Sequence, residues 1–473
     1  MVFSSNIFLF AFLPVCLLGY YLTRLATPKL RNHFLFAASC FFYFWGSGQI
    51  ALLFLAAVFV NHFLACRIAK ASPRWAKRLF WSGVAYNLGW LLYFKYLNFF
   101  WDNLSGLLGM FGGQLPQVAA IALPVGISFY TFQSIAYLAE VYQRQHPPAR
   151  SWLEYGTYLA FFPHVVAGPI VRYSDIDREI QSRRESVQLF FEGIWRFALG
   201  LGKKVIIANT LGSTADTLFG LPNSELSQSE AWLGALCYTF QIYFDFSGYS
   251  DMAIGLARMF GFHFPENFNQ PYRSQSVTDF WRRWHITMSN WFRDFVYIPL
   301  GGNRRGSSRT YLNLWIVFFL CGLWHGAAWT FVAWGMWHGL LLVLERLGKE
   351  RFGVAPKGLV GNACTFLLVL IGWVLFRADS VGQAFSFLGL MAGWGVSDAP
   401  AGFPVWYYLT PDVITCLALA FFFSWLPVER IRGIKVPELA AVCSQSFASV
   451  LLLVYSAAVL SKAAFNPFIY FRF

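Results

Sequence analysis

The sequence predicts an all-α, polytopic integral membrane protein, and three observations lead to this fold class. Hydrophobic residues make up 57% of the 473 positions and aromatic residues 20%, whereas charged residues make up only 12%, about half the usual share for globular proteins. Apolar runs close to the length of a bilayer recur along the chain. Lys and Arg concentrate in the short loops between these runs. Such a composition cannot cover a water-facing surface, which excludes a soluble enzyme, a coiled coil and a disordered chain.

The apolar runs are the candidate transmembrane segments, because a helix that crosses the hydrocarbon needs about 20 apolar residues. In chain order they are 7–22, 34–45, 50–66, 79–101, 118–142, 152–171, 190–211, 231–259, 311–347, 359–376, 413–426 and 447–464. The first lacks a preceding basic region and a following cleavage site, so we expect a retained span. Several others are short or interrupted. We therefore expect about 11 transmembrane helices with additional re-entrant and surface-parallel helices, in a single membrane-embedded domain covering residues 1–473.

The distribution of charge predicts the orientation of the chain. The 36 Lys and Arg residues exceed the 23 Asp and Glu residues and give a formal charge of +13. Basic loops are expected on the cytoplasmic side; they lie at 24–31, 67–78, 144–150, 172–184, 258–309, 346–357 and 430–435. Neither 210–257 nor 378–429 contains Lys or Arg. This pattern places the N-terminus outside, and it accounts for the basic excess without nucleic-acid binding.

Three segments do not fit simple crossings. Segment 152–171 has basic loops on both sides, segment 190–211 contains four charged residues, and segment 280–300 is also strongly charged. Each charge at the bilayer centre costs about 2.5–3.5 kcal/mol on the insertion scale. We expect re-entrant or surface-parallel helices here, which are allowed where protein or water satisfies the backbone. Irregular helices in the middle of a membrane protein usually surround a functional site.

Polar residues within the apolar segments are the first candidates for that site. Asp245, Ser247 and Ser250 interrupt the span at 231–259. Hydrogen bonding between helices, with Gly248 allowing close approach, is sufficient to explain the two serines. It is less suited to Asp245, because an intramembrane carboxylate is costly without a partner or a task.

A second cluster lies in the aromatic and basic segment 280–294. At helical spacing, Arg282, His285 and Ser289 would share one face. An interfacial anchor helix, with arginines facing lipid phosphates, explains the arginines and tryptophans of this segment. That explanation does not require His285.

A third cluster is Trp-His-Gly at 324–326, inside the apolar run 311–347. The neutral imidazole of His325 is suited to act as a general base or proton shuttle near pH 7, although a buried histidine is more often a satisfied core residue. A second Trp-His-Gly contains His338, 13 residues further on. On an unbroken helix the two histidines would point in different directions, so they need not act together.

The sequence lacks the short motifs that identify several common enzyme classes. There is no P-loop, no Gly-x-Ser-x-Gly, no His-Glu-x-x-His and no Cys/His metal cluster, and the eight cysteines form no Cys-x-x-Cys pair. The cysteines are typical of small core residues. We therefore expect no metal site, and the residues alone indicate a buried His and Asp site beside a basic cytoplasmic face.

At these motifs the sequence resembles the membrane-bound O-acyltransferases, in particular the bacterial branch that serves alginate O-acetylation and D-alanyl transfer to teichoic acids. The resembling segments are 123–130, 161–169, 243–251, 266–272, 280–285, 301–304, 323–326 and 466–471. Residues 1–6 and 95–98 extend the likeness toward the start. Each motif alone is weak, but the ordered set is specific. The resemblance implies a family core over about residues 120–430.

The resemblance also implies an architecture and a reaction. A ring of tilted helices would surround a central funnel, with His325 at its narrow point and His285 at the second family position. Acetyl-CoA would be the cytoplasmic acyl donor, with no bound cofactor. The acetyl group would cross the bacterial inner membrane to a secreted alginate-like or cellulose-like exopolysaccharide. It would do so directly or through a periplasmic acetyltransferase partner within an exopolysaccharide synthesis complex.

On this reading, His325 and His285 are the catalytic candidates. His325 would take the proton from the attacking hydroxyl, and His285 or Trp324 would hold the developing oxyanion. Arginines of the segment 258–309 would face the donor's pyrophosphate, and Asp245 would orient a histidine. The predicted substrate-binding residues are Trp324, Asp245, Ser247, Asn267, Arg282 and Arg283.

Three alternatives stay open from the sequence. Broken helices with intramembrane charges also suit a transporter or a channel of a polysaccharide export complex, although no repeated halves are visible. A non-catalytic scaffold predicts that replacing His325 has no effect. Finally, Cys321 lies four residues before His325, so a thiol activated by the imidazole would be able to carry the acetyl group covalently, although a packed, inert thiol is the more common role.

Overall fold

The computed structural model describes residues 2–113, 115–116, 118–353, 357–394, 403–426 and 437–462, and within these ranges every regular element is a helix. The all-α prediction is therefore confirmed for the described chain. The motif at 466–471 and the basic loop at 430–435 lie outside the described residues. Two compact units are present, one comprising residues 1–194 and 253–265 and the other residues 195–252 and 266–473.

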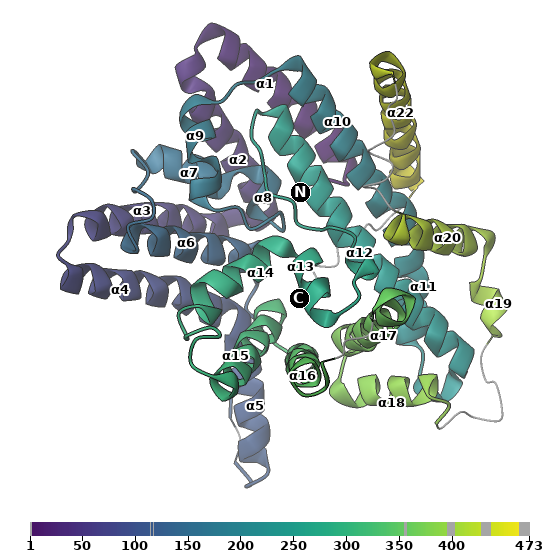
Figure 1. Cartoon of the computed structure of the whole chain (residues 1–473). Helices are drawn as coiled ribbons and strands as arrows, with labels where there is room; N and C mark the ends of the chain where they lie inside the picture. Colours follow the sequence, from purple (N-terminus) through teal and green to yellow (C-terminus); the bar gives the residue numbers. More distant parts are fainter. Residues whose placement is uncertain are drawn as a thin grey trace. The chain divides into compact units, whose positions relative to one another are not determined.

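One helix of the first unit, α6 (Ile127–Tyr142), is almost fully buried. In Figure 1 it lies between two neighbouring helices. Helices α3 (Ala51–Lys70) and α4 (Pro73–Leu91) pack against α6 and against each other. The turn before α6 depends on Gly126, which has φ +74°, and a Cβ there would lie 2.3 Å from the Val165 carbonyl oxygen. The other helices are α1 (Leu13–Ala26), α2 (Arg31–Ser47), α5 (Leu97–Gly109), α7 (Trp152–Ala160), α8 (Phe162–Val165) and α9 (Tyr173–Ser182).

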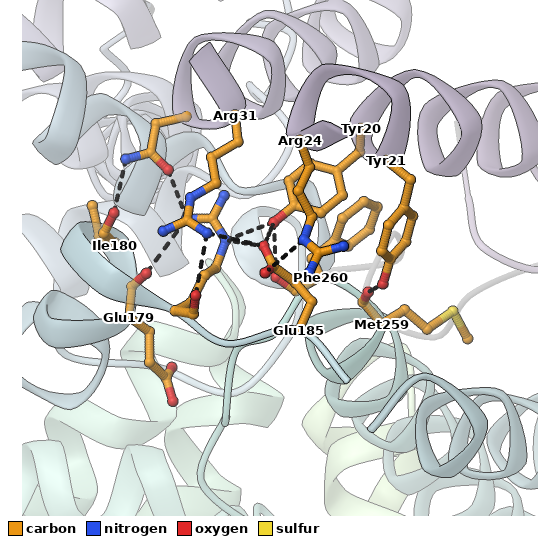
Figure 2. Close-up of polar contacts among 11 residues, drawn as sticks. Tyr20, Tyr21, Arg24, Arg31, Glu179, Ile180, Glu185, Met259 and Phe260 are labelled. Carbon is orange, nitrogen blue, oxygen red and sulfur yellow. Dashed lines mark hydrogen bonds and ion pairs between the residues drawn. The ribbon is translucent and has the colours of Figure 1, made fainter. Parts of the chain in front are cut away.

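A buried carboxylate connects the first two long helices of this unit to the segment after α9 (Figure 2). Glu185 accepts a hydrogen bond from the Tyr20 hydroxyl at 2.5 Å and pairs with Arg24 at 3.1 Å and Arg31 at 3.2 Å. Arg183 also donates to the Tyr20 hydroxyl, at 2.7 Å. Burial alone would raise the pKa of Glu185, but the Tyr20 hydrogen bond and the neighbouring guanidinium groups outweigh it and lower that pKa.

Glu185→Gln is expected to destabilise the first unit, because it leaves the buried guanidinium of Arg183, 3.7 Å away, and the partly exposed ones of Arg24 and Arg31 without their carboxylate. Breaking a buried pair typically costs about 3–5 kcal/mol, which a clear fall in the apparent melting temperature in detergent would report. Because the folded-state pKa of Glu185 is lowered, its stabilisation is present above the unfolded pKa of about 4.3 and is lost as the pH falls through the folded value. Glu350→Gln, at an exposed pair with Arg346, is the control. An equal melting temperature for Glu185→Gln and wild type would contradict this account.

The second unit contains the C-terminal helices and the long helix that carries Asp245. That helix, α12 (Gln228–Met259), and α10 (Val187–Gly202) each begin in one unit and end in the other. The remaining described elements are the π-helix η5 (Lys203–Ala208), α11 (Asn209–Gly220), the 3-10 helices η6 (Asn223–Glu225) and η7 (Pro271–Arg273), α13 (Val277–Arg283), α14 (Ile286–Phe292), the π-helix η8 (Arg293–Tyr297), α15 (Ser307–His325), α16 (Trp329–Phe352), α17 (Gly358–Arg377), α18 (Val381–Met391), α19 (Val405–Tyr408), α20 (Pro411–Trp425) and α22 (Glu438–Lys462).

Glycines let α15 and α16 pack with their backbones in contact. A Cβ at Gly322 would lie 2.4 Å from the Phe331 carbonyl oxygen, and one at Gly335 would lie 2.3 Å from the Phe318 carbonyl oxygen. No other residue type fits at such separations. The apolar run 311–347, which the sequence presents as one long segment, is therefore two helices that meet at a break over residues 326–328.

Several helices have the length and composition needed to cross a membrane. Among the described residues these are Phe8–Ala26, Pro28–Lys70, Gly358–Arg377 and Glu438–Lys462, and the shorter Val381–Met391 and Pro411–Trp425 are also apolar. The predicted spans 34–45 and 50–66 both lie within Pro28–Lys70. These helices fit a multi-pass membrane protein. The count of about 11 spans and the central funnel stay predictions.

The segments predicted to be irregular are broken helices. Segment 152–171 forms α7, capped by the Ser151 hydroxyl on the Glu154 N–H at 3.2 Å, and then the single turn α8 with Pro163 in its first turn. Segment 190–211 passes from α10 through the π-helix η5 into α11. Segment 280–300 contains the end of α13 and the whole of α14 and of the π-helix η8. Single π-helical turns often mark functional sites.

Candidate functional site

Three basic residues of segment 190–211 form ion pairs with carboxylates of α12 within the second unit. Lys204, from η5, lies 2.9 Å from the carboxylate of Asp245 on α12, and both side chains are almost fully buried. Asp251, two turns further along α12, pairs with Lys203 at 2.6 Å and with Arg196 at 2.7 Å. Asp245 and Asp251 of α12 therefore each have a basic partner from α10 or η5. Asp245 thus has Lys204 as an ion-pair partner, and the role of orienting a histidine that the resemblance implied for Asp245 stays a prediction.

Asp245→Asn is expected to lower stability sharply, because it leaves the Lys204 ammonium buried without its carboxylate. The expected cost is about 3–5 kcal/mol, whereas replacing both members of a buried pair by apolar residues is often neutral. The double variant Asp245→Leu/Lys204→Met should therefore recover much of the melting temperature lost in Asp245→Asn. A double variant less stable than the single one would show that the pair is not the main role of Asp245.

His285 is fully buried between two short helices and does not lie on a helical face. Its backbone is left-handed, with φ 42° and ψ 55°, a conformation that is rare and strained for a residue with a Cβ. The predicted common face of Arg282, His285 and Ser289 is therefore wrong, because α13 ends at Arg283 and α14 begins at Ile286. Arg282 is exposed, whereas His285 is enclosed. Strain at a buried histidine is typical of a functional position.

The segment that contains Asn267 holds His285 from both sides. The Asn269 N–H donates to the Arg283 carbonyl oxygen, and the Ile286 N–H donates to the Asn267 carbonyl oxygen, each at 2.9 Å. The Asn267 side-chain oxygen lies 3.1 Å from His285 Nδ1. These bonds fix both the backbone and the ring of His285. The local geometry that gives His285 its left-handed conformation is thus set by residues 267–269.

His325 is the last residue of α15 and sits among aromatic rings. Its ring centroid lies 4.9 Å from that of Trp324, 4.9 Å from Trp334 on α16 and 5.1 Å from Phe376 on α17. A Cβ on Gly326 would clash with the ring of Phe331, at 2.1 Å. The glycine of the Trp-His-Gly motif therefore makes room for the aromatic wall that encloses His325.

Trp324 brings the two histidines into one site. Its ring contacts the His325 ring and also lies 5.9 Å from the His285 ring, centroid to centroid. The side chains of Trp324, His285 and His325 are all nearly or fully buried. Residues that are 40 positions apart in the sequence thus meet around a single tryptophan.

The other predicted site residues have different surroundings. Ser247 is buried, and its hydroxyl has no hydrogen-bond partner among the described residues. Arg283 pairs with Asp279 one turn earlier in α13, at 2.9 Å. Cys321 is buried one turn before His325 in α15. The substrate-binding roles of Ser247, Arg282 and Arg283 and the covalent role of Cys321 stay predictions. No group of His, Cys, Asp and Glu able to hold a metal ion occurs in the described part of the chain.

Two supporting residues on α16 were missed or left open by the sequence analysis. His338 Nδ1 accepts a hydrogen bond from Trp281 Nε1 at 3.3 Å, and the Glu345 carboxylate accepts the N–H groups of Val277 and Thr278 at 2.7 and 3.2 Å. An acid at a helix N-terminus is favourable for both hydrogen bonding and the helix dipole. Helix α16 therefore holds α13, the helix directly before His285. In the sequence, His338 and Glu345 are seven residues apart, which places them on one face of a helix. That spacing does not show which residues they contact.

Comparison with known proteins gives a consistent result. A family described as MBOAT, membrane-bound O-acyltransferase family, matches residues 39–377. A probable alginate O-acetylase AlgI of Pseudomonas putida is 41% identical over all of both chains. A peptidoglycan O-acetyltransferase of Helicobacter pylori is 36% identical over 83% of this chain and 80% of its own. A teichoic acid D-alanyltransferase of Bacillus subtilis is 30% identical over 52% of this chain and 65% of its own.

Proposed function

The chain belongs to the membrane-bound O-acyltransferase family, and we propose that it moves an acetyl group from cytoplasmic acetyl-CoA to hydroxyl groups of a secreted, alginate-like exopolysaccharide. The multi-pass membrane location and the O-acyltransferase class follow from the family. The donor, the polymer, the bacterial inner membrane and the direction of transfer are the proposal. Two routes are compatible with this proposal. The acetyl group would pass directly to the polymer, or a periplasmic acetyltransferase would receive it and transfer it to the polymer.

The main support for this function is that His285 and His325 both lie against the ring of Trp324, in a buried aromatic environment. Acyl transfer to a hydroxyl requires a group that accepts the hydroxyl proton and a donor that holds the charge on the thioester oxygen. Two neutral imidazoles supply both functions, because each has one N–H and one lone pair. A low-dielectric aromatic enclosure strengthens such interactions.

The relatives support an acetyl group and a surface polymer. The alginate O-acetylases and the peptidoglycan O-acetyltransferase are named for acetyl transfer to glycans, and the more distant D-alanyltransferase is named for a different acyl group. Several alginate O-acetylases match at 39–47% identity, including two over their full length. We therefore favour alginate over peptidoglycan or cellulose as the acceptor. Because the chain belongs to a family of enzymes, we favour acyl transfer over the transporter and scaffold alternatives.

The test is an acceptor series with the purified protein in nanodiscs. Labelled acetyl-CoA would be supplied with polymannuronate, cello-oligosaccharide or a peptidoglycan fragment, each with and without periplasmic extract. Polymannuronate acetylation without extract would support direct transfer, and acetylation only with extract would support a periplasmic partner. Acetylation of only the peptidoglycan fragment or only the cello-oligosaccharide would overturn the alginate assignment. No thiol release with any acceptor or extract would overturn the acetyl-CoA assignment.

A further inference from the structure

Asn267 is fully buried, and both ends of its side-chain amide are engaged by the protein. Its Nδ2 donates to the Ser250 hydroxyl at 3.1 Å. Its Oδ1 faces three groups: the Thr287 N–H at 3.3 Å, the Thr287 hydroxyl at 2.9 Å and His285 Nδ1 at 3.1 Å. The substrate-binding role predicted from the sequence leaves these protein contacts unexplained.

These contacts determine which way the amide points. A backbone N–H can only donate a hydrogen bond, so the Asn267 atom that faces the Thr287 N–H is the oxygen. The opposite end, the amide nitrogen, then finds its acceptor in the Ser250 hydroxyl. The orientation of the amide thus follows from its neighbours, which is the only secure basis for such an assignment.

The orientation of the amide in turn fixes the proton on His285. Because Oδ1 of Asn267 can only accept, the imidazole nitrogen that faces it, Nδ1, must carry the proton. A neutral imidazole has a single N–H, so Nε2 is left with a lone pair. Nε2 of His285 is buried and has no hydrogen-bond partner among the described residues. The rings of Phe246 and Trp324 lie against this imidazole, at 4.7 and 5.9 Å.

We propose that Asn267 is a positioning residue that holds His285 in the Nδ1–H tautomer, so that Nε2 of His285 accepts the proton of the attacking hydroxyl. An oriented base of this kind, with a third group that sets its tautomer, is the general logic of activated nucleophiles. The left-handed backbone of His285 and the bonds on either side of it hold the ring in place. The nature of the hydroxyl rests on the proposed function; the tautomer does not.

The acetyl transfer uses only the hydroxyl, the thioester and the two histidines. The hydroxyl oxygen forms a bond to the carbonyl carbon of the acetyl thioester as its proton moves to His285 Nε2. The carbonyl oxygen becomes an oxyanion, which the N–H of His325 is suited to hold. Collapse of this intermediate breaks the C–S bond, and the leaving thiolate takes up the proton from His285. The products are the acetyl ester and the free thiol of CoA, and His285 is again neutral. This assignment exchanges the two histidine roles expected from the sequence.

The tautomer is measurable without any turnover. Histidine labelled with ¹³C and ¹⁵N, in protein reconstituted in nanodiscs, distinguishes a protonated from a lone-pair ring nitrogen by chemical shift, and His285→Gln assigns the signal. We expect a proton on Nδ1 and a lone pair on Nε2 in the wild type, and loss of this preference in Asn267→Ala. A wild-type His285 with its proton on Nε2 would overturn the proposal, as would an unchanged tautomer in Asn267→Ala.

Activity gives the second readout. Asn267→Ala is expected to lower kcat for thiol release by about 10–100-fold, the loss seen when the hydrogen-bond partner that orients a metal-binding histidine is removed, with KM for acetyl-CoA unchanged. Asn267→Asp keeps an acceptor oxygen for Nδ1–H and should recover part of kcat. Asn269→Ala is the matched control, because this exposed neighbour makes its contacts in the described chain through main-chain atoms, its N–H to the Arg283 carbonyl oxygen and its own carbonyl oxygen to the Arg283 guanidinium, and alanine keeps both.

The outcomes separate this proposal from the proposed function. If wild type releases no thiol but shows the Nδ1–H tautomer, the proposed function fails and the tautomer assignment stands. If Asn267→Ala turns over acetyl-CoA at the wild-type rate, the positioning role is wrong although the enzyme is active. If Asn267→Ala does not fold, the wild-type spectrum and Asn267→Asp decide the question: an Asp variant that folds but gives no recovery over His285→Gln would overturn the proposal.

Discussion

Replacing His325 with alanine is expected to abolish detectable acetyl transfer while the protein still folds and inserts. The change removes one of the two imidazoles of the proposed site and adds no charge to the membrane. Loss of one oxyanion donor costs about 10²–10³-fold, and loss of a general base costs about 10²–10⁴-fold. We therefore expect thiol release from acetyl-CoA to fall by at least about 10²-fold in nanodiscs, whether His325 holds the oxyanion or accepts the hydroxyl proton.

The controls for this variant are a folding test and a matched histidine. His325 lies in a tight aromatic enclosure with Trp334 and Phe376, so the variant's elution profile and melting temperature must first be shown to resemble those of wild type. His263→Ala, at an exposed histidine that pairs with Glu179, should retain full turnover. A folded His325→Ala protein with wild-type turnover would remove His325 from the mechanism.

Replacing His285 is expected to separate activity from stability. His285→Gly should lose about 10²–10⁴-fold in turnover, because no base remains at this position. The same change relieves the left-handed backbone at φ 42°, which costs a residue with a Cβ roughly 1–2 kcal/mol. The Asn267 oxygen keeps its two hydrogen bonds from Thr287. An inactive variant that melts at or near the wild-type temperature is therefore the expected result.

His285→Ala provides the comparison, because it removes the same imidazole but keeps the Cβ. We expect both variants to be equally inactive and the alanine variant to melt at a lower temperature than the glycine variant. Differential scanning fluorimetry in detergent and thiol release in nanodiscs measure the two properties. A glycine variant that is less stable than the alanine variant would show that the left-handed conformation is not a source of strain.

The general character of the fold was predictable from composition and periodicity. Low charge, long apolar runs and basic loops are sufficient to predict a helical membrane protein, and the described chain contains only helices as its regular elements. Segment 190–211, whose charges argued against a simple span, contains the π-helix η5, and its re-entrant or surface-parallel placement stays a prediction. The sequence did not indicate that Lys204 and Asp245 would neutralise each other, because partners in tertiary structure are not visible in local patterns.

The site was predicted by residue type but not by arrangement. His285 and His325 stood out because a histidine in an apolar segment is unusual, and the structure brings both to Trp324. Helical spacing predicted that Arg282, His285 and Ser289 share one face. That prediction is wrong, because the backbone is left-handed at His285 and interrupts the helix there. The roles of Asn267, His338 and Glu345 depend on contacts between segments distant in the sequence. Such contacts are set by packing, which periodicity does not report.

The measurement that tests the account most directly follows the acetyl group across the membrane. Proteoliposomes with the cytoplasmic face outward would receive labelled acetyl-CoA outside and polymannuronate with periplasmic extract inside. We predict labelled, ester-linked acetate on the enclosed polymer and free CoA thiol outside with the wild type, and neither with His325→Ala. Labelled polymer formed equally well by both proteins, or no thiol release by the wild type, would contradict a histidine-dependent acetyl transfer through this protein.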